Sequence, residues 1–331
     1  MKAAVFTEIK KPLAVQAVPN PLAALGEAVV QLKAAALNHR DLWIQLGQYV
    51  GIKTPMILGS DGAGTVLTVG SPKDTAWVGR EVIINPALDW GVNPRAQGSQ
   101  FRILGLPDAG TFAEQCVVPV ANLALKPSHL SWEQAAALPL TGLTAWRALF
   151  TRAQLQPGER VLITGIGGGA ALIALQLAVA AGAQVWVTSR SPEKIARAIS
   201  VGALGGVNYG EMNWAEALQQ QAGRFAVIVD SAGGEGLAQL IDLTTPGGRI
   251  VFFGATHGNP SSLDLRKCFF RQINLLGTTM GSPEDFANLM TFVAAHKITP
   301  VVDKVFPLAE ADAALRRMAA GEQFGKIVLA I

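Results

Sequence analysis

A cluster of glycines between two strand-like runs is the feature of this 331-residue sequence that most clearly predicts chemistry. The stretch VLITGIGGGAALIALQLAVAAGAQVWVTS contains a β-branched run, glycines, an apolar helix pattern and a second β-branched run. Such a βαβ unit brings backbone N–H groups and a helix N-terminus close to a pyrophosphate. The turn therefore predicts a dinucleotide site, with six candidate contacts: Gly165, Gly167, Gly168, Gly169, Ala170 and Ala171.

The end of the second strand bears on which dinucleotide binds. QVWVT is followed by Ser189 and Arg190, and no acidic residue precedes Glu193. Sites for NAD place an acid here for the ribose 2′-OH, whereas a 2′-phosphate carries about two negative charges and suits hydroxyl and guanidinium groups. Ser189, Arg190 and Lys194 therefore predict NADPH as the cofactor. The alternative is that both cations are ordinary solvated charges at the start of a helix.

Two later strand-like runs, in VDSAGG and GGRIVFFGATHG, also end in small residues. Ligands of open α/β sheets lie outside the carboxyl ends of the strands. These ends add four candidate cofactor contacts: Ser231, Gly254, Ala255 and Thr256. Turn formation alone is the alternative explanation for them.

Composition narrows the class of protein. Half of the residues are apolar and 15% are charged, which favours a large buried core over disorder. A net charge of +3 without a run of cations predicts no nucleic-acid partner, and the glycine cluster argues against a membrane span. No apolar leader is evident, and Cys116 and Cys268 are expected to be free core thiols. We expect a cytoplasmic protein.

The elements that must position these residues divide the chain into three parts. Residues 1–124 show short apolar runs broken by Gly and Pro, a pattern typical of a β-rich domain. Residues 125–282 alternate strands with helices, which predicts an α/β domain with a doubly wound parallel sheet. Residues 283–331 end in the strand-like GKIVLAI, which we expect to pair back with the first domain.

Five segments carry a family resemblance in the same order along nearly the whole chain. ALNHRDLWIQLG, ILGSDGAGTVLTVG, AAALPLTGLTAW, the glycine turn and GKIVLAI resemble the medium-chain dehydrogenase/reductase superfamily, and most of all its zinc-free, zeta-crystallin-like quinone oxidoreductase branch. The resemblance implies a GroES-like β-barrel catalytic domain over 1–124, a Rossmann domain over 125–282, and hydride transfer with NAD(P)H between the domains. It also implies a homodimer or homotetramer and places Tyr209 near the adenosine phosphate.

The chain departs from the zinc-dependent members of that superfamily. Asn38 stands where they carry Cys, and Ser60-Asp61 stands where they carry His-Glu. Thr141 is nearest the third ligand position and is instead a candidate cofactor contact. Catalytic zinc needs three protein ligands, so the sequence predicts no metal.

Without a Lewis acid, oxidation of a simple alcohol is difficult, whereas reduction of an activated acceptor is easier. The acceptor oxygen then needs a hydrogen bond or a proton. Asn38 and Tyr49 are the candidate catalytic donors, although Asn38 could be a buried turn-stabilising amide and Tyr49 a loop aromatic. We expect an NADPH-dependent reductase of a quinone or an α,β-unsaturated carbonyl compound. The alternatives are a zinc-type alcohol dehydrogenase and a non-catalytic NADPH-binding protein.

Overall fold

The computed structural model describes residues 1–331, which form two compact units. Unit 1 contains Met1–Thr141 and Gly281–Ile331, and unit 2 contains Gly142–Met280. The predicted boundary after residue 124 is too early. Helix α2 (Trp132–Ala136) begins at a Ser131–Gln134 capping box and packs on strands β3 (Glu27–Ala36) and β5 (Asp61–Val69). The helical pattern after residue 125 therefore starts within the barrel.

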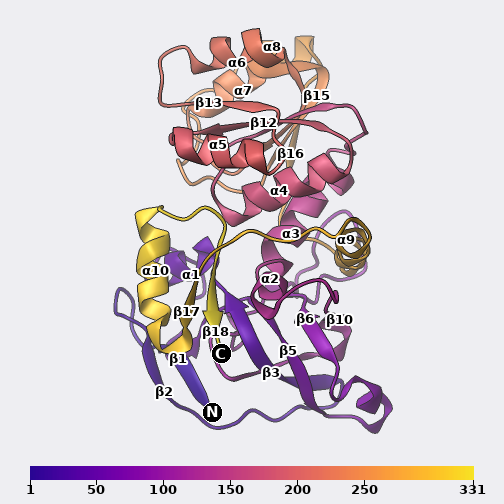
Figure 1. Cartoon of the computed structure of the whole chain (residues 1–331), viewed down its shortest axis with the longest axis vertical. Coiled ribbons are helices and arrows are strands. Elements are labelled where there is room, and N and C mark those ends of the chain that lie inside the picture. The colour runs from indigo at the N-terminus through magenta and orange to yellow at the C-terminus, as the bar shows by residue number, and fades with distance from the viewer. The chain divides into compact units, whose positions relative to one another are not determined.

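Two main sheets form unit 1 (Figure 1). The smaller sheet has the strand order β2 (Ala14–Ala17), β1 (Lys2–Phe6) and β4 (Met56–Ile57). The larger sheet has the order β10 (Leu123–Leu125), β6 (Glu81–Ile84), β5, β3, β18 (Lys326–Ala330) and β17 (Val302–Pro307), with β9 (Gln115–Pro119) also on β3. A short hairpin pairs β7 (Ala87–Leu88) with β8 (Arg102–Ile103).

Helices complete this unit and lead to the next one. Those of unit 1 are α1 (His39–Gln45), α9 (Pro283–His296) and α10 (Ala311–Ala320), with the 3-10 turns η1 (Pro72–Trp77), η2 (Val120–Asn122) and η4 (Leu308–Glu310). Helix α3 (Pro139–Trp146) spans the boundary and continues into the π-helical η3 (Arg147–Arg152).

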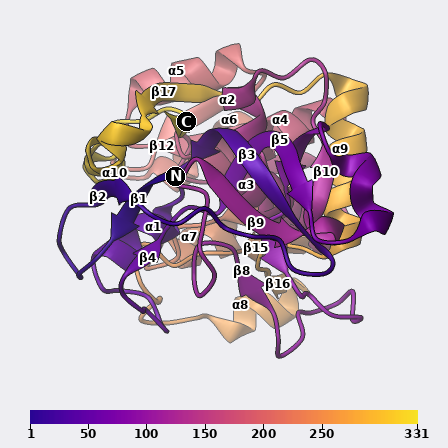
Figure 2. The ribbon, with the colours of Figure 1, turned by 90° about the horizontal axis from the view of Figure 1, so that it is seen from below.

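The C-terminal strand returns to unit 1 as the sequence indicates. Strand β18 pairs antiparallel with β3, so that Val328 lies opposite Ala36, and Ala36 lies opposite Asp61 of β5. This register brings Lys326, at the start of β18, close to the N-terminal end of β5. Both chain ends lie near each other in this unit (Figure 2).

Unit 2 is the predicted doubly wound α/β domain. Its parallel sheet has the order β13 (Gly205–Asn208), β12 (Gln184–Ser189), β11 (Arg160–Ile163), β14 (Phe225–Asp230), β15 (Thr244–Phe252) and β16 (Asn274–Gly277). Two helices, α4 (Gly169–Ala180) and α5 (Pro192–Ser200), lie on one side in Figure 1. Helices α6 (Trp214–Ala222), α7 (Gly236–Leu243) and α8 (Leu265–Phe270) lie on the other side.

Burial on both faces explains why the strands of unit 2 are so apolar. Leu162, Ile228 and Ile250 are completely buried in one cluster beneath α6 and α7. The apolar run after the glycine turn is the 12-residue α4, and none of the helices is both long and apolar enough to cross a bilayer. Cys116 and Cys268 are buried free thiols, as predicted.

Candidate cofactor site and polar centre

The glycine turn of unit 2 is shaped to admit a ligand. Gly165 has φ +63° and Gly167 has φ +127°, conformations that glycine adopts far more readily than other residues. A Cβ added to Gly165 or Gly168 would meet no atom within 4 Å. The turn is held in place because Ile166 N–H donates to the Thr188 carbonyl at 2.8 Å. Rigid backbone and open space thus form a cradle at the start of α4.

A cavity of about 250 Å³ opens beside this turn. Its lining includes three residues that the sequence predicts, Gly165, Arg190 and Tyr209, together with side chains from the ends of β11, β12 and β14. Ligand pockets commonly measure about 300–1,000 Å³, so this cavity suits one part of a dinucleotide. Its place at the carboxyl ends of the strands fits the adenosine half.

Arg190, packed on the ring of Tyr209, supplies positive charge to one side of the cavity. The Arg190 guanidinium carbon lies 5.4 Å from the centre of the Tyr209 ring, within the range of a cation–π contact. Lys194 extends over the turn, since a Cβ on Gly167 would lie 2.8 Å from Lys194 Cδ. The predicted cations therefore gather at the glycine turn.

Two carboxylates that the sequence analysis did not identify also line the cavity. Asp230 accepts hydrogen bonds from Thr164 Oγ1 at 2.5 Å and from Gly233 N–H at 2.8 Å. Glu235 accepts from the backbone N–H and the hydroxyl of Ser261 at 2.8 and 2.9 Å. Neither carboxylate is on β12, so Arg190 is the charged side chain that lines the cavity at the end of that strand.

The remaining predicted cofactor contacts of unit 2 fall into three groups. Gly169, Ala170 and Ala171 form the first turn of α4, next to the cradle. Ser189 is buried, and its Oγ accepts from Ser191 N–H at 3.2 Å, so its hydroxyl is used in the loop. Ser231, Gly254, Ala255 and Thr256 lie outside the cavity lining, with Thr256 Oγ1 donating to the Ser231 carbonyl at 3.2 Å.

Other lining residues also escaped sequence reasoning, among them Trp214, Gln239 and His257. His257 follows Thr256 directly and could have been found from the same strand end. Trp214 and Gln239 lie on α6 and α7 and carry no local pattern that marks them.

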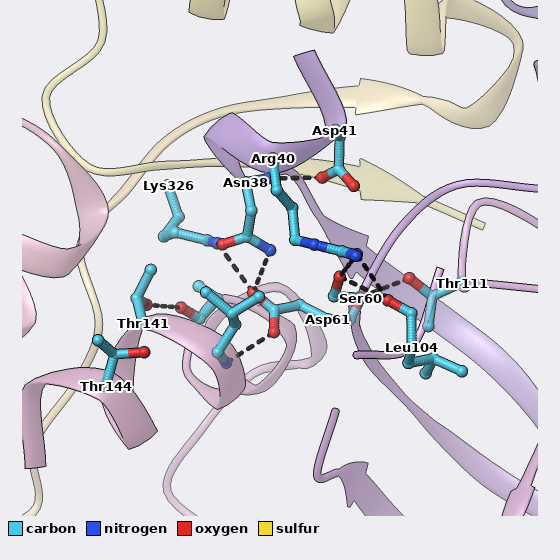
Figure 3. Close-up of polar contacts among 12 residues, drawn as sticks. Asn38, Arg40, Asp41, Ser60, Asp61, Leu104, Thr111, Thr141, Thr144 and Lys326 are labelled. Carbon is cyan, nitrogen blue, oxygen red and sulfur yellow. Dashed lines mark hydrogen bonds and ion pairs between the residues drawn. The ribbon is translucent and has the colours of Figure 1, made fainter. Parts of the chain in front are cut away.

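Unit 1 contains a second candidate site, a buried polar centre made of Asn38, Asp61 and Lys326 (Figure 3). Lys326 Nζ donates to Asp61 Oδ2 at 2.8 Å and to Asn38 Oδ1 at 2.7 Å. Asn38 Nδ2 donates to Asp61 Oδ2 at 3.0 Å. Leu140 N–H donates to Asp61 Oδ1 at 2.7 Å, so the carboxylate has three donors.

Sequence reasoning missed Lys326, although a sign was present. It is the single charged residue in the apolar run FGKIVLAI, and it is 3% exposed. A lysine in such a strand is rarely buried without an acidic partner. The partner, Asp61, comes from a strand that lies 265 residues away in sequence.

A shell of hydrogen bonds supports the polar centre. Arg40 Nη1 donates to Ser60 Oγ at 2.7 Å and to the Leu104 carbonyl at 2.8 Å. Asp41 Oδ2 accepts from Asn38 N–H at 2.7 Å, which caps α1. Burial raises the pKa of Asp41 to about 6, although the charge of Arg40 opposes this shift.

Tyr49, the second predicted donor, lies apart from these hydrogen bonds. Its partly buried ring packs on the core of unit 1, and the Arg40 guanidinium carbon lies 5.3 Å from the ring centre. The structure thus links Tyr49 to the shell of the polar centre through Arg40.

The residues at the expected metal-ligand positions do not fit zinc. Asn38 and Asp61 meet, but the carboxylate is already bound by Lys326. Thr141 lies in unit 1, where its hydroxyl donates to the Ala137 carbonyl at 3.4 Å. No three His, Cys, Asp or Glu side chains come together as a metal-holding group.

Two family models match the chain. Residues 24–128 match the alcohol dehydrogenase GroES-like domain, and residues 156–295 match the zinc-binding dehydrogenase family. The zinc-type alcohol dehydrogenase-like protein YogA of Leptosphaeria maculans is 34% identical over 98% of this chain and 96% of its own length. The acryloyl-coenzyme A reductase of Metallosphaera sedula is 30% identical over 99% of each chain.

A solved NAD-dependent alcohol dehydrogenase has the same fold along the whole chain. It is 37% identical, with a TM-score of 0.93 and coverage of 100% of both chains. The chain belongs to the medium-chain dehydrogenase/reductase superfamily. It is therefore an oxidoreductase of the type that uses a nicotinamide cofactor.

Proposed function

We propose that the chain is a zinc-free, NADPH-dependent reductase whose acceptor is an α,β-unsaturated carbonyl compound or a quinone. The observation that carries the proposal is the position of Arg190. It follows directly on β12 and lines the same cavity as Gly165, where an NAD site would place an acid.

The cofactor assignment follows from the charges around that cavity. A 2′-phosphate offers three acceptor oxygens and matches the guanidinium of Arg190. Lys194, beside Gly167, adds a second cation at the turn. The carboxylates of Asp230 and Glu235 already accept hydrogen bonds from the protein. When bound, the nicotinamide would supply the hydride.

The acceptor assignment follows from the polar centre. The positive charge in this centre is the Lys326 ammonium, which donates hydrogen bonds to Asn38 and Asp61. Without a Lewis acid, a conjugated carbonyl or a quinone is a better acceptor than a simple aldehyde, because the negative charge that hydride transfer places on it is delocalised. The similarity to an acryloyl-coenzyme A reductase supports an enoyl thioester as one member of this class. Tyr49 stays a candidate proton donor.

A screen of cofactor oxidation tests the proposal. NADPH and NADH are each offered with quinones, enones, enoyl-CoA thioesters and simple aldehydes, and the metal content of the protein is measured in parallel. We expect NADPH oxidation with at least one activated acceptor and less than one zinc per ten chains. Preference for NADH, or turnover confined to simple alcohols and aldehydes, would contradict it. NADPH binding without any turnover would favour the non-catalytic alternative.

We also propose that copies of the chain associate through unit 2. Strand β16 is an edge of its sheet, and α8 precedes it with Phe269 70% exposed and Phe270 84% exposed. An open strand edge beside exposed aromatic side chains favours pairing with a second copy. Sedimentation at the 34.7 kDa mass of a single chain would contradict this.

A further inference from the structure

We infer that Lys326 is a positioning residue that orients and polarises the Asn38 amide for the acceptor oxygen. Its ammonium thereby provides, from within the chain, the positive charge that a metal ion would otherwise bring to this centre. The inference rests on the proposed reduction of a carbonyl-type acceptor. It assigns a role to a buried lysine that does not line the cavity beside the glycine turn.

The orientation of the Asn38 amide is the first step of the argument. Asn38 Oδ1 accepts from Lys326 Nζ at 2.7 Å, and Asn38 Nδ2 donates to Asp61 Oδ2 at 3.0 Å. A cation on one side and an anion on the other allow only one of the two amide orientations. A neutral residue at position 326 would remove half of this constraint.

Polarisation is the second step. A cation at the carbonyl oxygen of an amide draws electrons from the nitrogen, so the N–H groups become stronger donors. Nδ2 carries two N–H groups, and the chain uses one of them, on Asp61. The second N–H can therefore donate to an oxygen on which negative charge develops during reduction.

Burial makes the effect specific to Lys326. Its side chain is 4% exposed and that of Asp61 is 0% exposed, so solvent screens their charges little. Strand β18 fixes the position of the lysine through its pairing with β3. The ammonium is consequently held in place rather than reaching the amide from a flexible surface position.

The kinetic test compares Lys326→Met with Lys304→Met, an exposed lysine on the adjacent strand β17. With an acceptor that the wild type reduces, we expect kcat to fall roughly 10- to 100-fold for Lys326→Met, since hydrogen bonds to charged groups have this size. The dissociation constant for NADPH and the activity of Lys304→Met should stay within about twofold of wild type. An unchanged kcat for Lys326→Met would overturn the inference.

A double variant separates positioning from simple neutralisation of Asp61. In Lys326→Met with Asp61→Asn, no buried charge is left unpaired, so the variant should fold even where Lys326→Met does not. If Lys326 only neutralises Asp61, the double variant recovers the wild-type kcat, which would overturn the inference. We expect its kcat to stay at least tenfold low.

A spectroscopic readout keeps this inference distinct from the proposed function. The side-chain amide signal of Asn38, assigned by its loss in Asn38→Ala, is followed by ¹⁵N NMR in Asp61→Asn and in the double variant, which keep the same side chain beside Nδ2 and differ only at position 326. We expect its nitrogen and proton shifts to move when the ammonium is removed, and not in Lys304→Met. An unmoved signal would overturn the inference even if the chain is a reductase. A moved signal would support positioning even if no acceptor is reduced.

Discussion

The glycine turn of unit 2 and the polar centre of unit 1 prepare for a ligand in opposite ways. At Gly165 and Gly168 a Cβ would meet nothing within 4 Å, so the turn offers backbone and empty space. In the polar centre, Asp61 is fully buried and already has three donors. The comparison shows that the turn gains its interactions from the ligand, whereas the Asp61 carboxylate has its donors before a ligand arrives.

This difference predicts different consequences of mutation. A side chain added at the glycine turn should block binding of the cofactor. It should lower the free energy of unfolding about as much as the same substitution at another glycine with positive φ. Removing a group from the polar centre should lower stability strongly, because its neighbours are left as buried unpaired charges.

The largest effect is expected for Asp61→Ala. The variant leaves the buried Lys326 ammonium without its carboxylate, so the free energy of unfolding should fall by about 3–5 kcal/mol. Urea denaturation measures this loss. Asp242→Ala is the control, because its ion pair with Lys267 is 44% exposed on both sides and should contribute about 1 kcal/mol or less. If the two variants lose the same free energy of unfolding, the buried polar centre is no more sensitive than an exposed ion pair, and the prediction is wrong.

Gly165→Val should block the cradle. A valine there fills the open space in front of the turn, and we expect NADPH to bind roughly 100-fold more weakly, a loss of about 2.7 kcal/mol. The control is Gly158→Val, at a residue with φ +82° and equally open surroundings, which carries a similar backbone strain. Isothermal titration calorimetry measures the affinity of both variants for NADPH. A similar loss of affinity in the control would mean that strain, and not the cradle, is responsible.

A smaller effect is expected for Arg190→Ala. Loss of the guanidinium should weaken NADPH binding by about 10- to 30-fold and NADH binding by less than about twofold. Arg197→Ala, an exposed arginine on α5, should change neither. Fluorescence titrations with both cofactors measure the ratio. Equal weakening of NADPH and NADH would contradict recognition of the 2′-phosphate.

The smallest effect is expected for Asp41→Asn, which tests the cost of burying a charge next to the polar centre. The pKa of Asp41 is about 6 in the folded chain against an ordinary 3.8, so its ionisation opposes folding as pH rises from 4 to 6. The variant should match wild type below pH 4 and be more stable by an amount on the order of 1 kcal/mol above pH 6. Denaturation curves at several pH values measure this. A pH-independent difference would show that burial of the Asp41 charge is not the cause.

The fold followed from local patterns wherever those patterns were strong. The glycine turn, α4 and β12 lie where VLITGIGGGAALIALQLAVAAGAQVWVTS predicts them. Strand β13 was not identified, because half of its four residues are glycine, a residue that disfavours strands. The first domain boundary was wrong because α2 has an ordinary helical pattern, and packing on β3 and β5 decides which unit holds it.

The candidate sites differ in the same way. Gly165 and Arg190 could be predicted, since each stands at the end of a recognisable strand, and Tyr209 was implied by the family resemblance. The hydrogen bonds that Asp230 and Glu235 accept beside Arg190 in the same cavity could not. A carboxylate looks the same in a sequence whether its donors are water or protein.

The sequence by itself determined the glycine turn, the alternation of strands and helices, and the residue types at Asn38 and Asp61, because these depend on neighbours along the chain. Only the tertiary structure decided that Lys326 reaches both of those side chains. Its strand is aligned by pairing with β3, and β3 with β5, so the contact joins residues 265 apart in the sequence. No local pattern records such a distance, because register is set by the sheet as a whole.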